Sequence, residues 1–290
     1  MKKFNIVVDS SCDLSYEYCL KHEIYPIFMK YTIGENIYTD TMKEEDIKEF
    51  YNQMRKGKVP KTGQVNTFDY FNYFSEVSEN KFPILYICLS SGLSGSYNNA
   101  LQTKEMLLEE YPNRKIYVID SLIASLGTGM QAIEAMKMRD EGKTIEETYE
   151  YLLDLSHKVN TYYTTNEMVY LYRGGRVNKL KYMVADVLKI NPILRVDNLG
   201  KLLVHQTVPG EKKTLRRIVE MVGKNVIDPE SQTLYVSHAD NLEKAKLYGE
   251  TIKEKYGFKD IFYSNIGTII GSHTGPGLVA VFFIGKERTE

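Results

Sequence analysis

Short apolar runs alternate with longer amphipathic segments along the chain, and turn-forming residues bound each apolar run. This alternation is typical of βαβ units and a mostly parallel sheet, so the pattern predicts an α/β fold. In the first half of the chain we expect strands at residues 4–8, 24–33, 84–89 and 116–119, with helices after most of them.

The pattern changes after roughly residue 158, where shorter strands become more frequent. We expect these strands at residues 162–165, 190–196, 201–208, 234–237, 261–265 and 279–284, with helices near 211–225 and 241–256. The turn-rich sequence Asp197-Asn198-Leu199-Gly200 predicts an antiparallel hairpin between the second and third of them. The chain is therefore expected to form an N-terminal, mostly parallel lobe (1–158) and a C-terminal mixed lobe (159–290), with a ligand between them.

Two sequences of the form Thr-x-x-Glu predict helix starts. In such a capping box the hydroxyl and the carboxylate satisfy each other's free backbone N–H groups. Thr41 with Glu44, and Thr144 with Glu147, have this spacing. We interpret both as structural.

Composition narrows the classes of partner. Of the 290 residues 43% are hydrophobic and 26% charged, the balance of a globular protein, and 37 basic residues face 38 acidic ones. This net charge of −1 provides no basic surface field, so nucleic acid is not an expected partner. The apolar stretches fall short of the ~20 residues that span a bilayer, and we expect a cytoplasmic protein.

Three cysteines, Cys12, Cys19 and Cys88, are widely spaced and form no C-x-x-C pair. We expect reduced, packed thiols rather than a zinc site, and no metal elsewhere.

The loops after the strands are the first place to look for a ligand site, because ligands of open parallel sheets bind beyond the carboxyl ends of the strands. Residues 90–96, Ser-Ser-Gly-Leu-Ser-Gly-Ser, stand between an expected strand and a helix from 97 to 111. Glycines that allow close approach, serine hydroxyls and a helix N-terminus together suit an anion. The Lys-Ser/Thr of a nucleotide-binding P-loop is absent, and an ordinary Gly-Ser turn is the alternative.

Three further segments contain chemically capable groups. Residues 9–13, Asp-Ser-Ser-Cys-Asp, are expected to cap and begin a helix. Residues 60–67 link two helices, with Asn66 or Thr67 as the cap of the second. Near the C-terminus, His273 stands among the glycines and the proline of residues 271–277, so the backbone should fix its position. We therefore expect a functional role for His273.

Taken together, these segments resemble the DegV family, the fatty-acid-binding subunits of bacterial fatty acid kinases. The resemblance covers essentially the whole chain and depends on the order and spacing of its motifs. These motifs are residues 8–14, Thr62-x-Gln64, residues 89–96, residues 118–121, Tyr172-Arg173-Gly174-Gly175-Arg176, residues 189–194 and residues 271–277.

The resemblance implies a two-lobe fold that encloses a long-chain fatty acid, with Thr62, Ser94 and His273, from three separate loops, holding the carboxylate. Ser91, Gly95, Ser96 and Thr274 are candidate supporting residues. The family further implies that this chain performs no catalysis, needs no cofactor, and presents the carboxylate to a separate kinase. The acyl phosphate formed would enter phospholipid synthesis through acyltransferases, and a transient membrane contact would be compatible with this role.

Two departures from the family pattern affect these expectations. The usual Thr-Ser-Gln-Pro-Ser is Thr62-Gly63-Gln64-Val65-Asn66 here, and without the proline the loop is less stiff. The usual Lys-Gly-Gly-Arg begins with Arg173, which keeps the charge with a different geometry. We expect Arg173 and Arg176 on an exposed glycine turn, where they could meet the kinase.

Two other functions remain open at this point. In a serine acyl hydrolase, Ser94 would be the nucleophile and His273 the base, with Asp9, Asp120 or Asp240 orienting the histidine. A binding module for phosphorylated metabolites would use residues 90–96, the serine loop, with Arg173 and Arg176 as phosphate ligands. Candidate residues for a tunnel wall are Ile190, Ile193, Leu194 and Ile270, although ordinary core packing explains them equally well.

Overall fold

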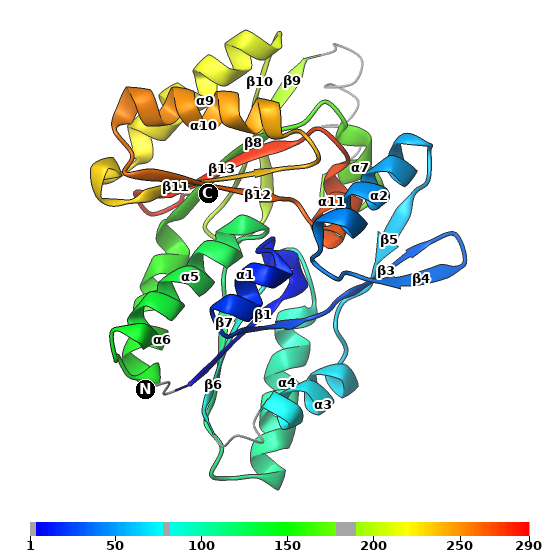
Figure 1. The fold of residues 1–290 in the computed structure, drawn as a ribbon, viewed down its shortest axis with the longest axis vertical. Coiled ribbons are helices and arrows are strands. Elements are labelled where there is room, and N and C mark those ends of the chain that lie inside the picture. Colours follow the sequence, from blue (N-terminus) through cyan, green and yellow to red (C-terminus); the bar gives the residue numbers. More distant parts are fainter. Residues whose placement is uncertain (1–3, 78–81, 178–189, 290) are drawn as a thin grey trace.

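The computed structural model describes residues 4–77, 82–177 and 190–289. Figure 1 shows two lobes, with the first half of the chain mainly in the lower lobe and the second half in the upper one. The expected two-lobe α/β fold, with a parallel sheet in the N-terminal lobe and a mixed sheet in the C-terminal lobe, is confirmed.

The N-terminal lobe contains a four-stranded parallel sheet in the order β2-β1-β6-β7. Its central strands are buried at every position, which explains why they read as continuous apolar runs. The strands are β1 (Asn5–Asp9), β2 (Ile24–Ile27), β6 (Ile84–Cys88) and β7 (Ile116–Asp120). The helices of this part are α1 (Tyr16–Lys21), α2 (Glu44–Arg55), α3 (Thr67–Val77), α4 (Ser96–Glu110), α5 (Leu126–Asp140) and α6 (Ile145–Lys158).

The prediction of a single strand at residues 24–33 is wrong. The chain forms β2 and then β3 (Lys30–Ile33), which leaves the parallel sheet and pairs with β4 (Asn36–Thr39) and β5 (Pro60–Thr62) in a three-stranded antiparallel sheet. Between them the backbone N–H of Met29 donates to Ser10 Oγ, a side-chain acceptor outside any ladder. β4 is mostly exposed and β5 has three residues, so neither has the apolar pattern that predicts a strand.

The C-terminal lobe contains a six-stranded mixed sheet in the order β10-β9-β8-β13-β11-β12. The expected hairpin is confirmed, because β9 and β10 pair antiparallel across the turn at residues 197–200. The strands are β8 (Val159–Thr164), β9 (Asn191–Val196), β10 (Leu202–Val208), β11 (Thr233–His238), β12 (Asp260–Asn265) and β13 (Val279–Ile284). The helical segments are α7 (Met168–Arg173), α9 (Glu211–Asn225), η2 (Pro229–Ser231), α10 (Leu242–Tyr256) and α11 (Thr268–Thr274).

Two structural details bear on the expected division of the chain. Helix α6 ends at Lys158 and β8, in the second sheet, begins at Val159, so we propose this junction as the lobe boundary. One apolar core nevertheless continues across both lobes, from Val7 in β1 to Phe282 in β13. A second core fills the space between the C-terminal sheet and helices α9 and α10.

One of the two predicted capping boxes is present. Thr144 Oγ1 accepts from the N–H of Glu147, and the Glu147 carboxylate accepts from the N–H of Thr144. The box at Thr41 is wrong, because Lys43 occupies the N-cap of α2 and Thr41 Oγ1 donates to the Asp46 carboxylate. At the start of α3, Asn66 Oδ1 accepts from the N–H of Asp69, as expected for its cap.

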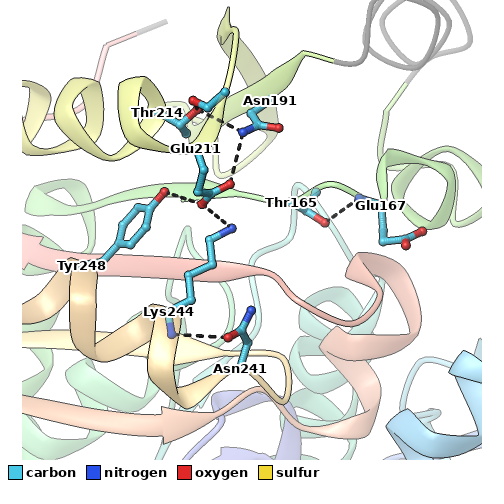
Figure 2. A network of polar contacts seen from close by, with 9 residues as sticks. Thr165, Glu167, Asn191, Glu211, Thr214, Asn241, Lys244 and Tyr248 are labelled. Atoms are coloured by element: carbon cyan, nitrogen blue, oxygen red, sulfur yellow. Dashed lines mark hydrogen bonds and ion pairs between the residues drawn. The ribbon is translucent and has the colours of Figure 1, made fainter.

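A polar network joins helices α9 and α10 of the C-terminal lobe to the start of β9 (Figure 2). Glu211 of α9 forms an ion pair with Lys244 of α10 at 2.6 Å and accepts a hydrogen bond from Tyr248 Oη at 3.1 Å. Asn191 Nδ2 donates to Glu211 at 3.2 Å and to Thr214 Oγ1 at 3.3 Å. The network thereby links β9, the first strand of the β9–β10 hairpin, to both helices.

Near the C-terminus, Arg288 ties the lobes together. Its buried guanidinium donates to the carbonyl oxygens of Leu122 in the N-terminal lobe and of Val159 and Asp197 in the C-terminal lobe. Burial lowers the pKa of Arg288 to about 10, so the group remains charged at neutral pH.

All three cysteines are buried and free. Among the described helices, none is both long and apolar enough to cross a membrane.

Candidate functional site

A cavity of about 360 Å³ lies where the serine loop, β5, α11 and the C-terminal sheet meet. This volume is within the range of small-molecule sites. Most of its wall is apolar: Met29, Leu89, Leu93, Ile123, Ala124, Leu171, Val196, Leu202, Ile266, Ile269, Ile270, Leu278, Ala280 and Phe282. The remaining wall residues are Thr62, Gly63, Gln64, Ser94, Gly95, Ser125, Thr161, Tyr163, Arg176, His273 and Thr274.

Thr62 and His273 meet at this wall. Thr62 is the last residue of β5, and its Oγ1 is hydrogen-bonded to His273 Nε2 at 2.8 Å. His273 lies on the short helix α11 rather than in the glycine loop that the sequence predicted. Its ring packs against Gly174, where an added Cβ would lie 2.3 Å from Nδ1. Among the described residues Nδ1 has no hydrogen-bond partner.

Ser94 lies in the loop after β6, as expected. Its hydroxyl is hydrogen-bonded to Ser96, the first residue of α4. Ser94 Oγ donates to Ser96 Oγ at 3.0 Å and accepts from the Ser96 N–H at 3.2 Å. Gln64 covers Gly95 so closely that a Cβ there would lie 2.1 Å from Gln64 Oε1. The glycine thus lets residues of two loops approach each other beside the cavity.

The hairpin of the C-terminal lobe fixes the serine loop from its other side. Ser90 Oγ donates to the carbonyl oxygen of Gly200 at 3.0 Å. An added Cβ at Gly92 would lie 2.7 Å from the Leu199 carbonyl oxygen. The positive φ of Gly200, 72°, suits the tight turn that makes this contact. Both lobes therefore determine the position of Ser94.

His273 is neutral at neutral pH. Burial lowers the pKa of its imidazole to about 4, and the nearby charge of Arg176 adds to this effect. A neutral imidazole has one N–H donor and one acceptor nitrogen, so it can act as a donor without being a fixed cation.

The expectation that Arg173 and Arg176 form an exposed pair is wrong for Arg176. Arg173 is exposed at the end of α7, whereas Arg176 is half-buried and lines the cavity. The Arg176 guanidinium donates to the carbonyl oxygens of Leu93, at 2.7 Å, and Gly174. A positive charge thus lies directly behind the serine loop. Burial lowers the pKa of Arg176.

The structure separates the four supporting candidates. Gly95 lines the cavity, and the buried Ser96 is bonded to Ser94. Thr274 also lines the cavity, but its hydroxyl donates to the carbonyl oxygen of Ile270 within α11. Ser91 is exposed and does not line the cavity, and its N–H donates to Asp120.

Of the candidate tunnel residues, only Ile270 lines the cavity. Ile193 and Leu194 are buried core, the alternative that the sequence left open. Ile190 does not line the cavity. Lys189, which contributes to one family motif, lies outside the described residues.

The acids proposed to orient His273 are engaged elsewhere. Asp9 accepts from Tyr86 Oη and the N–H of Leu89, Asp120 accepts from two backbone N–H groups, and Asp240 pairs with Arg55. Ser94 and His273 each have other hydrogen-bond partners, Ser96 and Thr62. A Ser-His-acid triad is therefore not assembled among the described residues.

Four wall residues with polar side chains were not proposed as site residues from the sequence: Gln64, Ser125, Thr161 and Tyr163. Thr161 and Tyr163 are two residues apart on β8 and therefore share one face of the strand. The strand expected at residues 162–165 began too late to include Thr161. Ser125, in the loop after β7, has a φ of 60°. A positive φ is uncommon for a serine, so nothing in the sequence indicated this backbone conformation. Gln64 did stand within the Thr62-x-Gln64 motif.

Within residues 4–77, 82–177 and 190–289, no group of three or more His, Cys, Asp or Glu side chains is arranged to hold a metal ion.

Known proteins share this architecture. Residues 3–286 match the model of the DegV family, described as uncharacterised proteins. A fatty acid-binding protein of Thermotoga maritima is 33% identical over 99% of each chain. The crystal structure of a DegV lipid-binding protein from the same organism has a TM-score of 0.85 and 30% identity, covering 99% of this chain and 100% of that one.

A more distant match has the same fold. The B3 protein of the Streptococcus pneumoniae fatty acid kinase, solved with linoleic acid, has a TM-score of 0.85 at 20% identity, covering 97% of this chain and 99% of that one. Since the family model and the 33% identical relative both extend over nearly the whole chain, the protein belongs to the DegV family.

Proposed function

We propose that this protein binds one long-chain fatty acid in the inter-lobe cavity and acts as a carrier without catalytic activity of its own. The observation that carries the proposal is the contrast within one wall. Thr62, His273 and Arg176 are linked to the serine loop or to each other, whereas fourteen other wall residues have apolar side chains.

The energetics suit an amphipathic ligand. Burying a chain of about sixteen carbons at ~0.8 kcal/mol per methylene supplies on the order of 11 kcal/mol. Association costs roughly 4–15 kcal/mol, so apolar burial alone is marginal. The carboxylate must also be satisfied, because a buried anion without partners costs several kcal/mol.

We propose Thr62, Ser94 and His273 as the ligands of that carboxylate. Hydroxyl and imidazole donors would stabilise the anion, and the charge of Arg176 lies behind them through its bond to Leu93. Because none of these three donors is a cation, the carboxylate would not be neutralised by a direct ion pair. It would remain available for phosphorylation.

Mass spectrometry of the lipid that co-purifies with the protein tests this function. We expect organic extraction to release a long-chain fatty acid, and delipidated protein to bind oleate or palmitate in a calorimetric titration. Protein that is consistently empty and also fails to bind added oleate would refute the proposal.

The two other functions make different predictions. A serine hydrolase would be labelled by a fluorophosphonate probe at Ser94, and we expect no labelling because His273 contacts Thr62 rather than Ser94. A binding module for phosphorylated metabolites would need both arginines at one site. Arg173 is exposed and Arg176 half-buried, which disfavours that arrangement.

We further propose a separate kinase as the partner, with the resulting acyl phosphate passing to acyltransferases of phospholipid synthesis. This role is supported by the S. pneumoniae protein of the same fold, which is the B3 protein of a fatty acid kinase. Exposed Arg173, two residues after Leu171 of the cavity wall, is the residue that such a kinase could contact.

Arg173→Ala should reduce kinase-coupled phosphorylation of the fatty acid and leave oleate affinity nearly unchanged, because charges at an interface rim mainly change encounter rates. Arg216→Ala, an exposed arginine on α9, is the matched control. Arg176→Ala should instead reduce both quantities, since Arg176 lines the cavity. Equal loss of both in Arg173→Ala would contradict the docking role, and ATP hydrolysis by this chain alone would contradict the carrier role.

A further inference from the structure

Helix α11, which carries His273, follows β12 of the C-terminal sheet but packs on elements of the first half of the chain. It contacts β3, β5, α2 and η1 (Ser10–Cys12) and lies beside α2 and α7 in Figure 1. The position of His273 therefore depends on how the N-terminal lobe holds this seven-residue helix.

A buried carboxyl group holds the start of the helix. Asp13, 3% exposed, follows η1 and has φ of 56°. Its Oδ1 accepts from the N–H of Gly267, the N-cap of α11, at 2.8 Å, and Ser125 Oγ is hydrogen-bonded to its Oδ2. Ser264 Oγ, at the end of β12, donates to the Asp13 carbonyl oxygen. One residue thus connects α11, β12 and the loop before α5.

Gly267 leaves little free space at this contact. An added Cβ would lie 3.1 Å from Asp13 Oδ1 and 3.5 Å from Asp40 Oδ2. Tyr51 of α2 adds a second attachment, because its Oη donates to the carbonyl oxygen of Ile266 at 2.9 Å. The start of α11 is therefore held in a defined position about two turns before His273.

The opposite end of the helix makes the contact that the ligand would use. His273 Nε2 is bonded to Thr62 at 2.8 Å, and its ring abuts Gly174. A helix this short moves as a rigid unit, so a displacement at Gly267 shifts the imidazole relative to Thr62.

We propose that Asp13 is a positioning residue for the fatty acid site, acting through Gly267 and α11 to place His273. This inference depends on the proposed fatty-acid binding and extends it to a residue outside the cavity wall. Asp13 does not contact the ligand, so its effect on affinity must pass through α11.

A substitution series with delipidated full-length protein and oleate tests the assignment. Asparagine can accept from the Gly267 N–H and donate to Ser125, and burial, which raises the pKa of Asp13 to about 8, makes the neutral amide a close mimic. Asp13→Ala should bind oleate about 10-fold more weakly, and Asp13→Asn should stay within about 3-fold of wild type.

A double-mutant cycle separates positioning from general stabilisation. If Asp13 acts through His273, adding Asp13→Ala to His273→Ala should weaken binding by less than about 3-fold. Gly267→Ala perturbs the same contact without removing the carboxyl group, and it should also lose most of its effect in the His273→Ala background. This variant decides the question if Asp13→Ala does not fold.

Ile252→Ala is the matched control for loss of stability, because Ile252 is fully buried in the core behind the C-terminal sheet, away from α11. It should destabilise the protein and leave oleate affinity unchanged. Additive losses in the cycle, or equal losses in Asp13→Asn and Asp13→Ala, would overturn the positioning role while leaving fatty-acid binding intact. Wild-type protein that binds no oleate would refute the proposed function itself.

Discussion

The hydrogen bond between Thr62 Oγ1 and His273 Nε2, 2.8 Å long, connects two residues 211 positions apart in the chain. Thr62→Val keeps the shape of the side chain and removes the hydroxyl. We expect oleate affinity to fall by ~1–3 kcal/mol, because the carboxylate loses one donor and the imidazole one partner. Titration calorimetry measures the change.

Thr32→Val is the control for this variant, since Thr32 lies on β3 of the same sheet and its hydroxyl donates to the Lys61 carbonyl oxygen at 3.5 Å. Its affinity for oleate should match that of wild type. An unchanged affinity in Thr62→Val would remove Thr62 from the site.

Gly174 should be sensitive to a single added methyl group. Its φ of −74° is accessible to alanine, but the new Cβ would lie 2.3 Å from His273 Nδ1, so the ring must move. We expect Gly174→Ala to weaken oleate binding by about 1–3 kcal/mol, the usual cost of overpacking. In the His273→Ala background the same substitution should cost almost nothing, and an equal cost in both backgrounds would contradict this explanation.

Stability should fall as pH rises from about 6.5 to 8. Burial raises the pKa of Asp13 to about 8, from an unfolded value near 3.8, so the folded state retains a proton that the unfolded state loses. Its contribution is complete below the unfolded pKa and is lost as pH rises through the folded one, on the order of 2 kcal/mol across this window.

Three other buried groups titrate mainly below that window. The pKa of Asp40 is raised to about 6, and those of His238 and His273 are lowered to about 4. Urea unfolding at pH 6.5, 7.5 and 8.5 should therefore show the decline in wild type and a much flatter profile in Asp13→Asn. Parallel profiles would show that another group titrates here.

Two adjacent tyrosines of β8 should respond oppositely to loss of their hydroxyl groups. Tyr162 Oη accepts from Asn225 Nδ2 at 2.7 Å, so Tyr162→Phe should destabilise the protein by about 1 kcal/mol. Tyr163 Oη is buried without a partner among the described residues, and burial raises its pKa. Tyr163→Phe should thus be neutral or stabilising in chemical unfolding, and clear destabilisation would indicate a bound water or ligand at this hydroxyl.

The sequence was sufficient where one local signal determined the structure. Continuous burial made β1 and β6 visible as apolar runs, and the turn at residues 197–200 predicted the hairpin of β9 and β10. Through the family resemblance, the order of short motifs pointed to Thr62, Ser94 and His273. The structure places all three on the wall of one cavity, and their role as carboxylate ligands stays a prediction.

Features that depend on distant contacts could not be predicted in this way. Arg176 looked like an exposed neighbour of Arg173, but the Leu93 carbonyl oxygen, 83 residues earlier, holds it at the cavity. β4 and β5 exist because β3 pairs with both, not because of their own composition. Asp13 looked like part of a helix start until Gly267, 254 residues away, provided its partner.

The separation of Thr62 and His273 along the chain also has a consequence for biosynthesis. The N-terminal lobe can begin to fold during translation, but the proposed head-group site is incomplete until α11 has emerged and docked. A nascent chain would therefore have no complete carboxylate site to offer a fatty acid. Because a ligand stabilises only the species that binds it, fatty acid should selectively protect finished molecules, with both lobes closed, from proteolysis.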